Sequence, residues 1–369
     1  MEFEYAGKQP KDVILGRALK HEPINFSIDH SNLIKGNNFD ALATLLVSGY
    51  KGKIDLIYID PPFNTKQDFT ISEGRISTIS RGAKKHVAYS DNMSTQEYIE
   101  FIRERLILMK ELLSDHGSIY LHIDNKMGHY LKVILDEVFG MNNFKNDISR
   151  IKSNPKNFNR KAFGNQKDMI LFYSKNHKLN IFNNIRLNID LSDKERMFKK
   201  IDEKGRRYNT VPVHAPGETQ FGRTGGLWRD MMPPAGRHWR TDPSELEKLD
   251  AAGLIEWSKN GVPRIKRYAD EHKGMKMQDL WTFVDPAYPS YPTEKNLKML
   301  EMIVRQSSND NSIVLDCFAG SGSTLLAAGN FGRTWVGIDQ SDYSIEVIKK
   351  RFKNVEYNYF EIPPIDPIA

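Results

Sequence analysis

The tetrad Asp60-Pro61-Pro62-Phe63 places a carboxylate and an aromatic ring on one turn, directly after the apolar run 54–59. Two consecutive prolines fix two φ angles and remove two N–H donors, so the turn is stiff and its carbonyl oxygens remain as acceptors. A planar ring with an exocyclic amine, such as a nucleobase, needs acceptors for its N–H bonds and an aromatic face to stack on. Packing alone does not require an acid there, so the tetrad predicts a site for an amine-bearing ring.

A second turn that could bind a ligand, Phe318-Ala319-Gly320-Ser321-Gly322-Ser323-Thr324, follows the apolar run 313–316. The dinucleotide fingerprint has a third glycine or an alanine at the position of Leu325, and no phosphate-loop lysine is present. The next apolar run, 334–338, ends at Asp339, an acid that can accept hydrogen bonds from ribose hydroxyls. These residues predict a ligand that contains a nucleoside but need not contain a pyrophosphate.

Both turns lie in segments that alternate between strand and helix, the pattern of a parallel sheet with crossover helices. Ser94 and Glu97 form a capping-box pattern, and Gly140 ends a helical stretch. The predicted strands are 33–35, 54–59, 118–123, 169–173, 313–316 and 334–338, and the predicted helices are 39–46, 95–113, 128–139, a stretch from 297, and a stretch from the second turn to 328. The polar residues 64–93 predict a mobile loop that could close over a substrate.

The middle of the chain has a different composition. Residues 150–285 contain 27 Lys and Arg against 17 Asp and Glu, whereas the rest contains 26 against 30. From about 180 to 290 the alternation gives way to short segments rich in Gly, Pro, Trp and Arg. Basic residues interleaved with Trp228, Trp239, Trp257 and Tyr268 suit a nucleic-acid face, but some of these tryptophans must belong to the core. Apolar neighbours favour a core position for Trp257 and for Trp281.

Composition predicts a soluble globular protein. Of the 369 residues, 39% are hydrophobic and 27% are charged. No apolar run approaches the roughly 18 residues of a membrane span, and the acidic start Met1-Glu2-Phe3-Glu4 is unlike a signal peptide, so we expect a cytoplasmic protein of a prokaryote that acts with DNA and without a membrane. The single Cys317 excludes intramolecular disulfides and cysteine-rich zinc sites, and no His-Glu-x-x-His pattern occurs, so no metal is predicted.

The two turns, in this order, resemble those of the β class of S-adenosylmethionine-dependent amino-group DNA methyltransferases. In that class the catalytic motif precedes a target-recognition region, which precedes the cofactor motif. The resemblance runs from about Leu33 to Phe352. It implies an α/β, Rossmann-like methyltransferase fold, a seven-stranded mostly parallel sheet with helices on both faces, and an inserted target-recognition region. The expected division is 1–178 for the catalytic half, 179–288 for target recognition and 289–369 for the cofactor half.

The resemblance also implies roles for individual residues. The predicted catalytic residues are Asp60, Pro61, Pro62 and Phe63. The predicted cofactor contacts are Asn37, Asp60, Lys295, Asp316, Phe318, Ala319, Gly320, Gly322, Thr324 and Asp339. The predicted DNA contacts are Asn64, Lys66, Arg223, Arg237, His238 and Arg240. Lys295 belongs to Tyr291-Pro292-Thr293-Glu294-Lys295, which resembles the short motif before the cofactor strand; Asn296 stands where proline is commoner, and Asn37 where aspartate is usual.

A leading aspartate in the tetrad implies methylation of adenine N6, whereas a leading serine more often implies cytosine N4. The lone pair of the exocyclic amine is delocalised into the ring, so acceptors on both N–H bonds favour a pyramidal, more nucleophilic nitrogen. We predict the Asp60 carboxylate and the Pro61 carbonyl as these acceptors. A flipped-out base would stack on Phe63 and gain about 1 to 3 kcal/mol. The implied cofactor is S-adenosylmethionine, with S-adenosylhomocysteine as product and no metal.

Other functions remain open at this point. A cytosine-N4 or an RNA methyltransferase would share both turns. A nicotinamide-dependent enzyme could use the glycine turn and Asp339 but gives no reason for the two prolines, and a non-catalytic DNA-binding protein gives no use for a ligand turn. Methylation of cytosine carbon 5 needs an activated cysteine, and Cys317 lies within the cofactor strand region, where we interpret it as a small buried hydrophobe. Double-stranded DNA is the expected partner; a cognate restriction endonuclease and a second copy of the chain are candidates.

Overall fold

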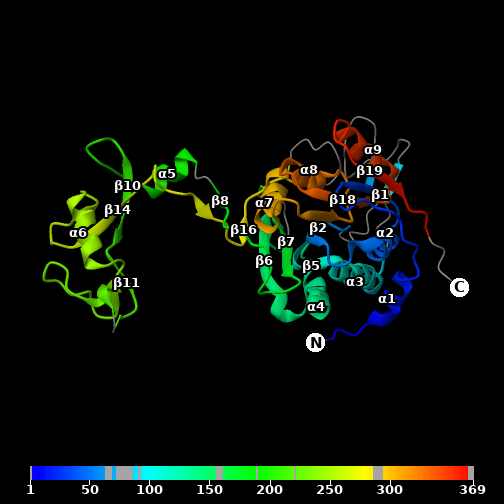
Figure 1. Cartoon of the computed structure of the whole chain (residues 1–369), viewed down its shortest axis with the longest axis horizontal. Helices are drawn as coiled ribbons and strands as arrows, with labels where there is room; N and C mark the ends of the chain where they lie inside the picture. Colours follow the sequence, from blue (N-terminus) through cyan, green and yellow to red (C-terminus); the bar gives the residue numbers. More distant parts are fainter. Residues whose placement is uncertain are drawn as a thin grey trace. The chain divides into compact units, whose positions relative to one another are not determined.

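The chain forms two compact units, residues 1–184 with 278–369 and residues 185–277. The structure is a computed structural model that describes residues 2–62, 69–71, 86–89, 93–154, 161–187, 190–219, 222–285 and 294–364 (Figure 1). The first unit contains both turns that the sequence singles out, and the second contains most of the basic middle segment. Each unit is therefore taken by itself below.

A mixed β-sheet organises the first unit. Its strands are β1 (Asn32–Lys35), β2 (Ile54–Ile59), β5 (Leu113–Ile123), β6 (Phe144–Ile151), β7 (Lys167–Ser174), β16 (Leu280–Trp281), β17 (Ile313–Asp316), β18 (Thr334–Asp339) and β19 (Asn358–Glu361). They lie in the order β16-β6-β7-β5-β2-β17-β18-β1-β19. Only β7 runs antiparallel to its neighbours β5 and β6 among the ladders of this sheet.

The mostly parallel sheet with helices on both faces is confirmed, but the expected strand number is not. The described residues give nine strands in this sheet rather than seven. The short edge strands β16 and β19 belong to this count, and neither carries an apolar alternation long enough to be recognised in the sequence.

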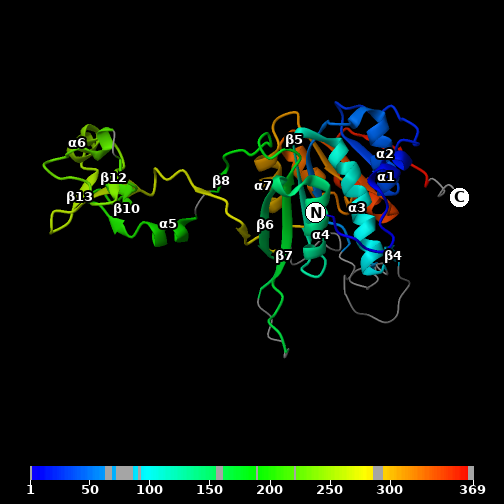
Figure 2. The same ribbon diagram turned by 90° about the horizontal axis from the view of Figure 1, so that it is seen from below.

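Helices cover both faces of the sheet (Figure 1). On one side, α3 (Thr95–Leu112) lies between α4 (Gly128–Phe139) and the pair α1 (Lys11–Ala18) and α2 (Asn38–Leu45), as Figures 1 and 2 both show. On the other side are α7 (Leu297–Ser307), α8 (Ser323–Asn330) and α9 (Asp342–Arg351). A π-helical turn (Leu46–Tyr50) follows α2, and a 3-10 turn (Met141–Asn143) follows α4. The central strands are buried on both faces, which explains their continuous apolar sequence.

Local signals in the sequence set the ends of two helices. Ser94 caps α3 with the full capping box predicted from Glu97, because each side chain accepts a hydrogen bond from the other residue's backbone N–H. Gly140 ends α4 with a φ of 94°, which favours glycine. Cys317 is 1% exposed, so its interpretation as a buried hydrophobe is confirmed. None of the helices in the described part of the chain is long and apolar enough to span a membrane.

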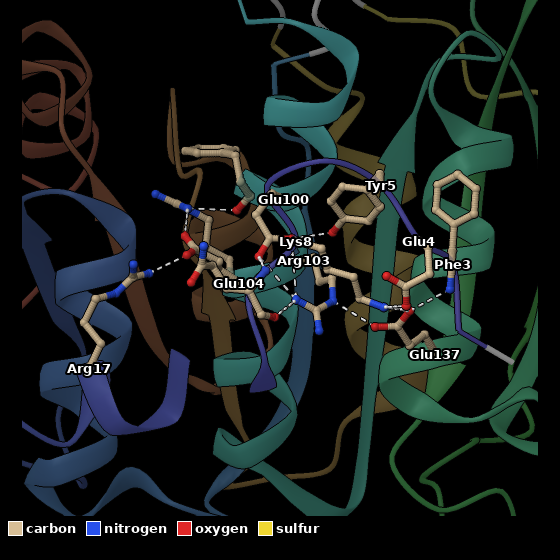
Figure 3. A network of polar contacts seen from close by, with 12 residues as sticks. Phe3, Glu4, Tyr5, Lys8, Arg17, Glu100, Arg103, Glu104 and Glu137 are labelled. Carbon is tan, nitrogen blue, oxygen red and sulfur yellow. Dashed lines mark hydrogen bonds and ion pairs between the residues drawn. The ribbon is translucent and has the colours of Figure 1, made fainter. Parts of the chain in front are cut away.

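Hydrogen bonds and ion pairs of charged side chains connect the segment before α1 to α3 and α4 (Figure 3). Arg103 of α3 donates to Glu137 of α4 at 2.9 Å and to the carbonyl of Gln9 at 2.9 Å. Glu137 also accepts from Lys8 and from the backbone N–H of Phe3, both at 3.1 Å. The N-terminal segment thus packs against the helical layer through one partly buried network.

The second unit has its own small core. A four-stranded antiparallel sheet has the order β13-β14-β10-β9, and two antiparallel strand pairs, β11-β12 and β15-β8, accompany it. The elements are β8 (Arg186–Leu187), α5 (Leu191–Met197), β9 (Lys200–Ile201), β10 (Arg207–Pro212), β11 (His214–Pro216), a 3-10 turn (Arg223–Gly225), β12 (Arg237–Trp239), α6 (Pro243–Ala251), β13 (Ile255–Trp257), β14 (Pro263–Tyr268) and β15 (Met275–Lys276). Val213, Leu246, Ile255 and Ile265 pack together in its core.

The tryptophan assignments need correction. Trp228 and Trp239, expected on a nucleic-acid face, are each 3% exposed and belong to the core of the second unit. Tyr268, expected on the same face, is 7% exposed. Trp257, expected in the core, is 37% exposed, whereas Trp281 is buried as predicted. A small unit needs large apolar side chains for its core, and charged neighbours in the sequence do not reveal which aromatic rings turn inward.

The predicted mobile loop 64–93 falls largely outside the described residues. Its described parts are β3 (Phe69–Ile71) and β4 (His86–Tyr89), which pair antiparallel.

Candidate active site

The two turns singled out in the sequence meet in one cleft of the first unit. β2 and β18 both pair with β17, so the residues that follow these three parallel strands lie side by side at one edge of the sheet. The cleft is lined by Asn38, Tyr58, Asp60, Pro62, Phe101, Lys295, Leu300, Asp316, Cys317, Phe318, Ala319, Gly320, Ser321, Ser323, Thr324, Asp339, Gln340, Ser341 and Ser344.

Asp60 is the centre of this cleft's charge pattern. Its Oδ2 lies 2.5 Å from Nζ of Lys295, and its side chain is 16% exposed. Its Oδ1 is buried and accepts no hydrogen bond from the residues that the structure describes. Nδ1 of the buried His122 lies 3.7 Å from that oxygen. One carboxylate oxygen is thus held by a lysine while the other keeps its acceptor capacity.

The glycine turn between β17 and α8 is shaped by backbone conformation. Gly320 and Gly322 have φ of 51° and 75°, values that side-chain-bearing residues rarely adopt. A Cβ at Gly322 would lie 3.0 Å from Cγ1 of Ile348, so α9 also packs closely there. The N–H of Gly320 donates to Oδ2 of Asp339 at 2.8 Å, and this bond ties the turn to the end of β18.

Two further acids line the cleft, and burial changes their titration. Burial raises the pKa of Asp316 to about 7; hydrogen bonds from Thr324 and from the backbone N–H of Phe318 oppose the rise, and the charges of Asp60 and Asp339 add to it. Burial also raises the pKa of Asp339, although the N–H groups of Ser341 and Gly320 oppose this. Three neighbouring carboxylates make the cleft a favourable place for a cationic ligand that also carries hydroxyl groups.

Most of the predicted cofactor residues come together here. Those that line the cleft are Asp60, Lys295, Asp316, Phe318, Ala319, Gly320, Thr324 and Asp339, together with the predicted catalytic Pro62. Gly322 caps α8, and Pro61 is buried behind the turn. Asn37 caps α2 by accepting from the N–H of Phe39 at 2.8 Å, and its neighbour Asn38 is the one that lines the cleft. Phe63, Asn64 and Lys66 lie outside the described residues.

Sequence similarity identifies the family. A sequence model of the N6_N4_Mtase family, DNA methylase, matches residues 54–350. The chain belongs to this family of DNA methylases. Type II methyltransferase M.EcaI of Enterobacter cloacae is 41% identical over 364 residues, which cover 95% of this chain and 77% of the relative. The StyLTI Mod subunit, a type III restriction-modification protein of Salmonella typhimurium, is 26% identical over 81% of this methylase but only 49% of its own length.

A solved structure agrees with the fold. The PvuII DNA methyltransferase (cytosine-N4-specific) matches with a TM-score of 0.50 and 12% identity, covering 97% of this methylase and 99% of that chain. At this identity the likeness concerns the fold alone. No group of three or more side chains that could hold a metal ion occurs within the described ranges.

Several residues of the methylase site were not predicted from sequence. Ser321 and Ser323 lie inside the predicted turn, but Phe101 comes from α3 and Ser341 and Ser344 from the start of α9. No local motif marks these residues; they follow from the packing of α3 and α9 at the same edge of the sheet. His122, buried on β5, contacts the site only through the pairing of β5 with β2.

The predicted DNA contacts of the methylase differ in their surroundings within the second unit. Arg223 is exposed and lies 3.7 Å from the carboxylate of Asp242. Arg237 NH1 lies 3.2 Å from His214 Nδ1, and Arg240 donates to the carbonyl of Pro212 at 2.8 Å. The ring of His238 lies 2.7 Å from the carbonyl of Gly217.

Proposed function

We propose that this methylase transfers a methyl group from S-adenosylmethionine to N6 of a flipped-out adenine in duplex DNA, at a specific sequence. The observation that carries the proposal is Asp60, whose Oδ1 is a buried acceptor without a donor among the described residues while Lys295 holds Oδ2. A buried acceptor left open costs stability, and it becomes useful when the substrate supplies the missing N–H.

The cleft fits the cofactor in charge and in shape. S-adenosylmethionine carries a sulfonium and an ammonium group, which suit the carboxylates of Asp60, Asp316 and Asp339. Its ribose hydroxyls suit Asp339 at the end of β18, and its adenine suits the apolar walls that Phe101 and Phe318 provide. The turn from Phe318 to Thr324 would hold it. When bound, the cofactor supplies an electrophilic methyl group, whose S–C bond breaks with its electron pair going to sulfur as the N–C bond forms.

The residues of the chain prepare the amine for this transfer. Oδ1 of Asp60 and the Pro61 carbonyl accept the two N–H bonds of the target amine, which draws its lone pair out of the ring and toward the methyl group. The nitrogen then loses one proton, which leaves for solvent by way of Asp60. No covalent enzyme intermediate is needed, so orientation supplies much of the rate.

The choice of adenine over cytosine rests on the leading acid of the tetrad. The alternative, methylation of cytosine N4, uses the same geometry on a different ring. Digestion of the methylated DNA to nucleosides distinguishes the two bases, because it yields either N6-methyladenosine or N4-methylcytidine in the deoxy series. Only N4-methylcytosine in the product would contradict the choice of base.

For the DNA side, we assign binding to the second unit. Its arginines fall into two sets. Arg223 and Arg229 are among those that pair with carboxylates, whereas Arg237, Arg240 and Arg264 make no ion pair with any carboxylate in the described part of the chain. Arg186 and Arg267 also make no such pair among the described residues, but Arg237, Arg240 and Arg264 are the ones that lie close enough to His214 to lower its pKa, after burial as the first cause. This set of guanidinium groups without counter-ions suits DNA phosphates and guanine edges.

The relatives suggest the biological setting. Type II methyltransferase M.EcaI and several type III restriction-modification Mod subunits align with this chain. We infer that the protein protects DNA within a restriction-modification system, where a restriction endonuclease would act on the same sequence. The chain spans about half the length of the Mod subunits, so the inference concerns only the part of them that aligns with this chain.

The test is methyl transfer from tritiated S-adenosylmethionine to unmodified genomic DNA by Asp60→Ala and Asp60→Asn. Both variants should lose at least about a thousandfold in rate, as expected when a principal transition-state contact is removed, and should keep DNA binding. Asp115→Ala, an exposed acid at the far end of β5, is the matched control and should keep full activity. Full methyl transfer by Asp60→Ala would contradict the mechanism.

A further inference from the structure

A line of buried polar side chains runs across the sheet from Asp60. His122 on β5 is 0% exposed. Its Nδ1 lies 2.8 Å from the hydroxyl of Tyr58 on β2, and its Nε2 lies 3.4 Å from Oδ2 of Asp168 on β7. Asp168 in turn accepts from Lys152, which directly follows β6, at 2.6 Å. Three adjacent strands, β2, β5 and β7, therefore contribute to a connected set that continues just past the end of β6.

The line closes into a ring that returns to Asp60. Arg150 of β6, also 0% exposed, has NH1 3.8 Å from Asp168 and an ion pair from NH2 to Asp285. Asp285 accepts from the backbone N–H of Asn296 at 3.0 Å. Asn296 caps α7 and directly follows Lys295, whose Nζ holds Oδ2 of Asp60. The ring thus connects the two halves of the active site through the interior of the sheet.

The partners of His122 determine its protonation. Asp168 is ionised at neutral pH, since burial raises its pKa but the bonds from His122 and Lys152 outweigh this and lower it to about 2. An ionised carboxylate only accepts, so Nε2 of His122 must carry a hydrogen. Burial keeps the pKa of Tyr58 well above its ordinary value, so its hydroxyl stays protonated and can donate to Nδ1. In the neutral ring, Nδ1 then accepts from Tyr58, and Nε2–H lies 3.4 Å from the carboxylate of Asp168.

This protonation state has a consequence for Asp60. An Nδ1 that accepts from Tyr58 has no hydrogen to give to Oδ1 of Asp60, 3.7 Å away. A protonated ring would instead present an N–H to that oxygen, and a charge-assisted hydrogen bond there would occupy the acceptor. Burial lowers the pKa of His122, although Asp168 and Asp60 oppose this, so the neutral ring persists at neutral pH.

We propose that His122 is a positioning residue for methyl transfer, which the hydroxyl of Tyr58 keeps in its neutral, Nε2-protonated form so that Oδ1 of Asp60 stays open for the N–H of the target amine. The inference rests on the proposed function, because it presupposes that Asp60 receives that amine. The assignment of His122 and Tyr58 comes from the buried contacts of these two side chains.

The charges around His122 set the sign of the pH dependence. The groups that face it are Tyr58 and Asp60 from β2 and its turn, Asp168 from β7 and Lys295 from the start of α7. Arg150 of β6 and Lys152, which directly follows β6, reach it through Asp168. Without the Tyr58 hydroxyl, Nδ1 loses the donor from which it accepts. The imidazole then lies between the carboxylates of Asp60 and Asp168, which favour its protonation. Tyr58→Phe should therefore lose activity at a higher pH than the wild type as the pH falls.

The experiment measures single-turnover methylation of unmodified genomic DNA between about pH 5.5 and pH 9, the range in which a histidine titrates. We expect the activity of Tyr58→Phe, relative to its own value at about pH 9, to fall about tenfold per pH unit below the raised pKa of His122. In Tyr58→Phe with His122→Gln this acid limb should disappear, because the titrating ring is gone. Tyr120→Phe is the matched control: it removes another buried tyrosine hydroxyl, which bonds Ser307 at 2.7 Å, and should keep the wild-type profile.

The possible outcomes separate the two proposals. If Tyr58→Phe and Tyr120→Phe give the same pH profile, the role of His122 is wrong while methyl transfer through Asp60 stands. If the wild type transfers no methyl group from tritiated S-adenosylmethionine to DNA, the proposed function itself fails. If Asp60→Asn keeps full activity, the proposed role of Asp60 fails, whatever the profiles show. Nitrogen-15 shifts of the His122 ring in the wild-type protein, assigned with His122→Gln, give a readout that needs no variant to be active. They should report a neutral Nε2–H ring at pH 7, and a protonated ring or the Nδ1–H form would overturn the inference.

Discussion

At the scale of single residues, the cleft combines three carboxylates with one close lysine. Asp60 is held by Lys295, whereas Asp316 and Asp339 receive mainly backbone N–H bonds. Such an arrangement leaves the cleft short of positive charge among the lining residues that the structure describes. Repulsion between like charges and burial both oppose ionisation of Asp316, and a bound cation would relieve this. The electrostatics thus favour binding at the expense of stability.

Asp316→Asn tests whether the Asp316 carboxylate lowers the stability of the protein and strengthens the binding of a cation. The pKa of Asp316 is about 7 in the folded protein and about 4 in an unfolded chain, so ionisation removes stability as the pH rises from about 4 to about 7. The variant cannot ionise, so its stability relative to the wild type should grow across that range, by on the order of 1 to 4 kcal/mol. Its affinity for S-adenosylmethionine should fall about tenfold at pH 8, since a cationic ligand loses one counter-charge.

Thermal unfolding and calorimetric titration with S-adenosylmethionine at pH 5, 7 and 8, values spaced about the Asp316 pKa, measure both effects. Asp115→Asn is the control for removal of an exposed acid and should change neither quantity. If Asp316→Asn were less stable than the wild type at pH 8, the stated electrostatic cost of Asp316 would be wrong.

The residues that sequence alone could identify are those close together in the chain. Asp60 to Pro62 and Phe318 to Thr324 each form one turn after one strand, so their types and order sufficed. Asn37 shows the limit of this reasoning. The cap of α2 turns its side chain toward Phe39, and the adjacent Asn38 lines the cleft, a difference of one residue that only the helix start determines.

At the scale of elements, strand pairing was the information missing from the sequence. His122, Asp168 and Arg150 lie on three strands and meet only because β5, β7 and β6 are neighbours in a particular register. Strong apolar runs with glycine, proline or a capping box at their ends, such as α3 and α4, could be placed closely. Two-residue strands such as β16 could not, since backbone pairing, not apolar pattern, forms them.

The N-terminal attachment to α3 and α4 is an element whose stability can be tested through Glu137. This carboxylate joins Arg103, Lys8 and the backbone of Phe3 (Figure 3). Glu137→Gln keeps the shape of the side chain but removes its charge from two ion pairs, and Arg103 is 4% exposed. We expect a loss of about 1 to 3 kcal/mol in the free energy of unfolding, because the buried guanidinium of Arg103 loses one of its two carboxylate partners and keeps only Glu100.

The loss should depend on pH with a definite sign. Burial raises the pKa of Glu137, but hydrogen bonds from Phe3, Arg103 and Lys8 outweigh it and hold the pKa below its ordinary value. The stabilisation is therefore present at neutral pH and is lost as the pH falls through the lowered pKa. Urea unfolding at pH 7 and at about pH 3.5 should show the difference between wild type and Glu137→Gln shrinking in acid. Glu346→Gln, an exposed acid on α9, should change stability by less than about 0.5 kcal/mol.

At the scale of the whole molecule, the cleft and the arginines proposed to bind DNA belong to different units. The first unit holds every residue that lines the cleft, and the second holds Arg237, Arg240 and Arg264, which pair with no carboxylate among the described residues. The second unit also has its own tryptophan-containing core, so substitutions on its surface need not disturb the cleft. Replacing unpaired arginines should therefore affect DNA affinity first, and methyl transfer at saturating DNA much less.

Arg237→Ala with Arg240→Ala is the sharpest test of this division. Each phosphate contact that is lost should weaken DNA binding and reduce the slope of log affinity against log salt by roughly 0.9. Arg206→Ala is the matched control, because Arg206 is a partly exposed arginine of the same unit that pairs with Asp270 at 2.8 Å and Glu271 at 2.7 Å. Fluorescence anisotropy with labelled duplex DNA across a salt series measures affinity and slope together. An unchanged slope in the double variant would show that these arginines do not contact DNA. If the slope fell equally in Arg206→Ala, any surface arginine would contribute to binding, and the absence of carboxylate partners would not mark the binding face.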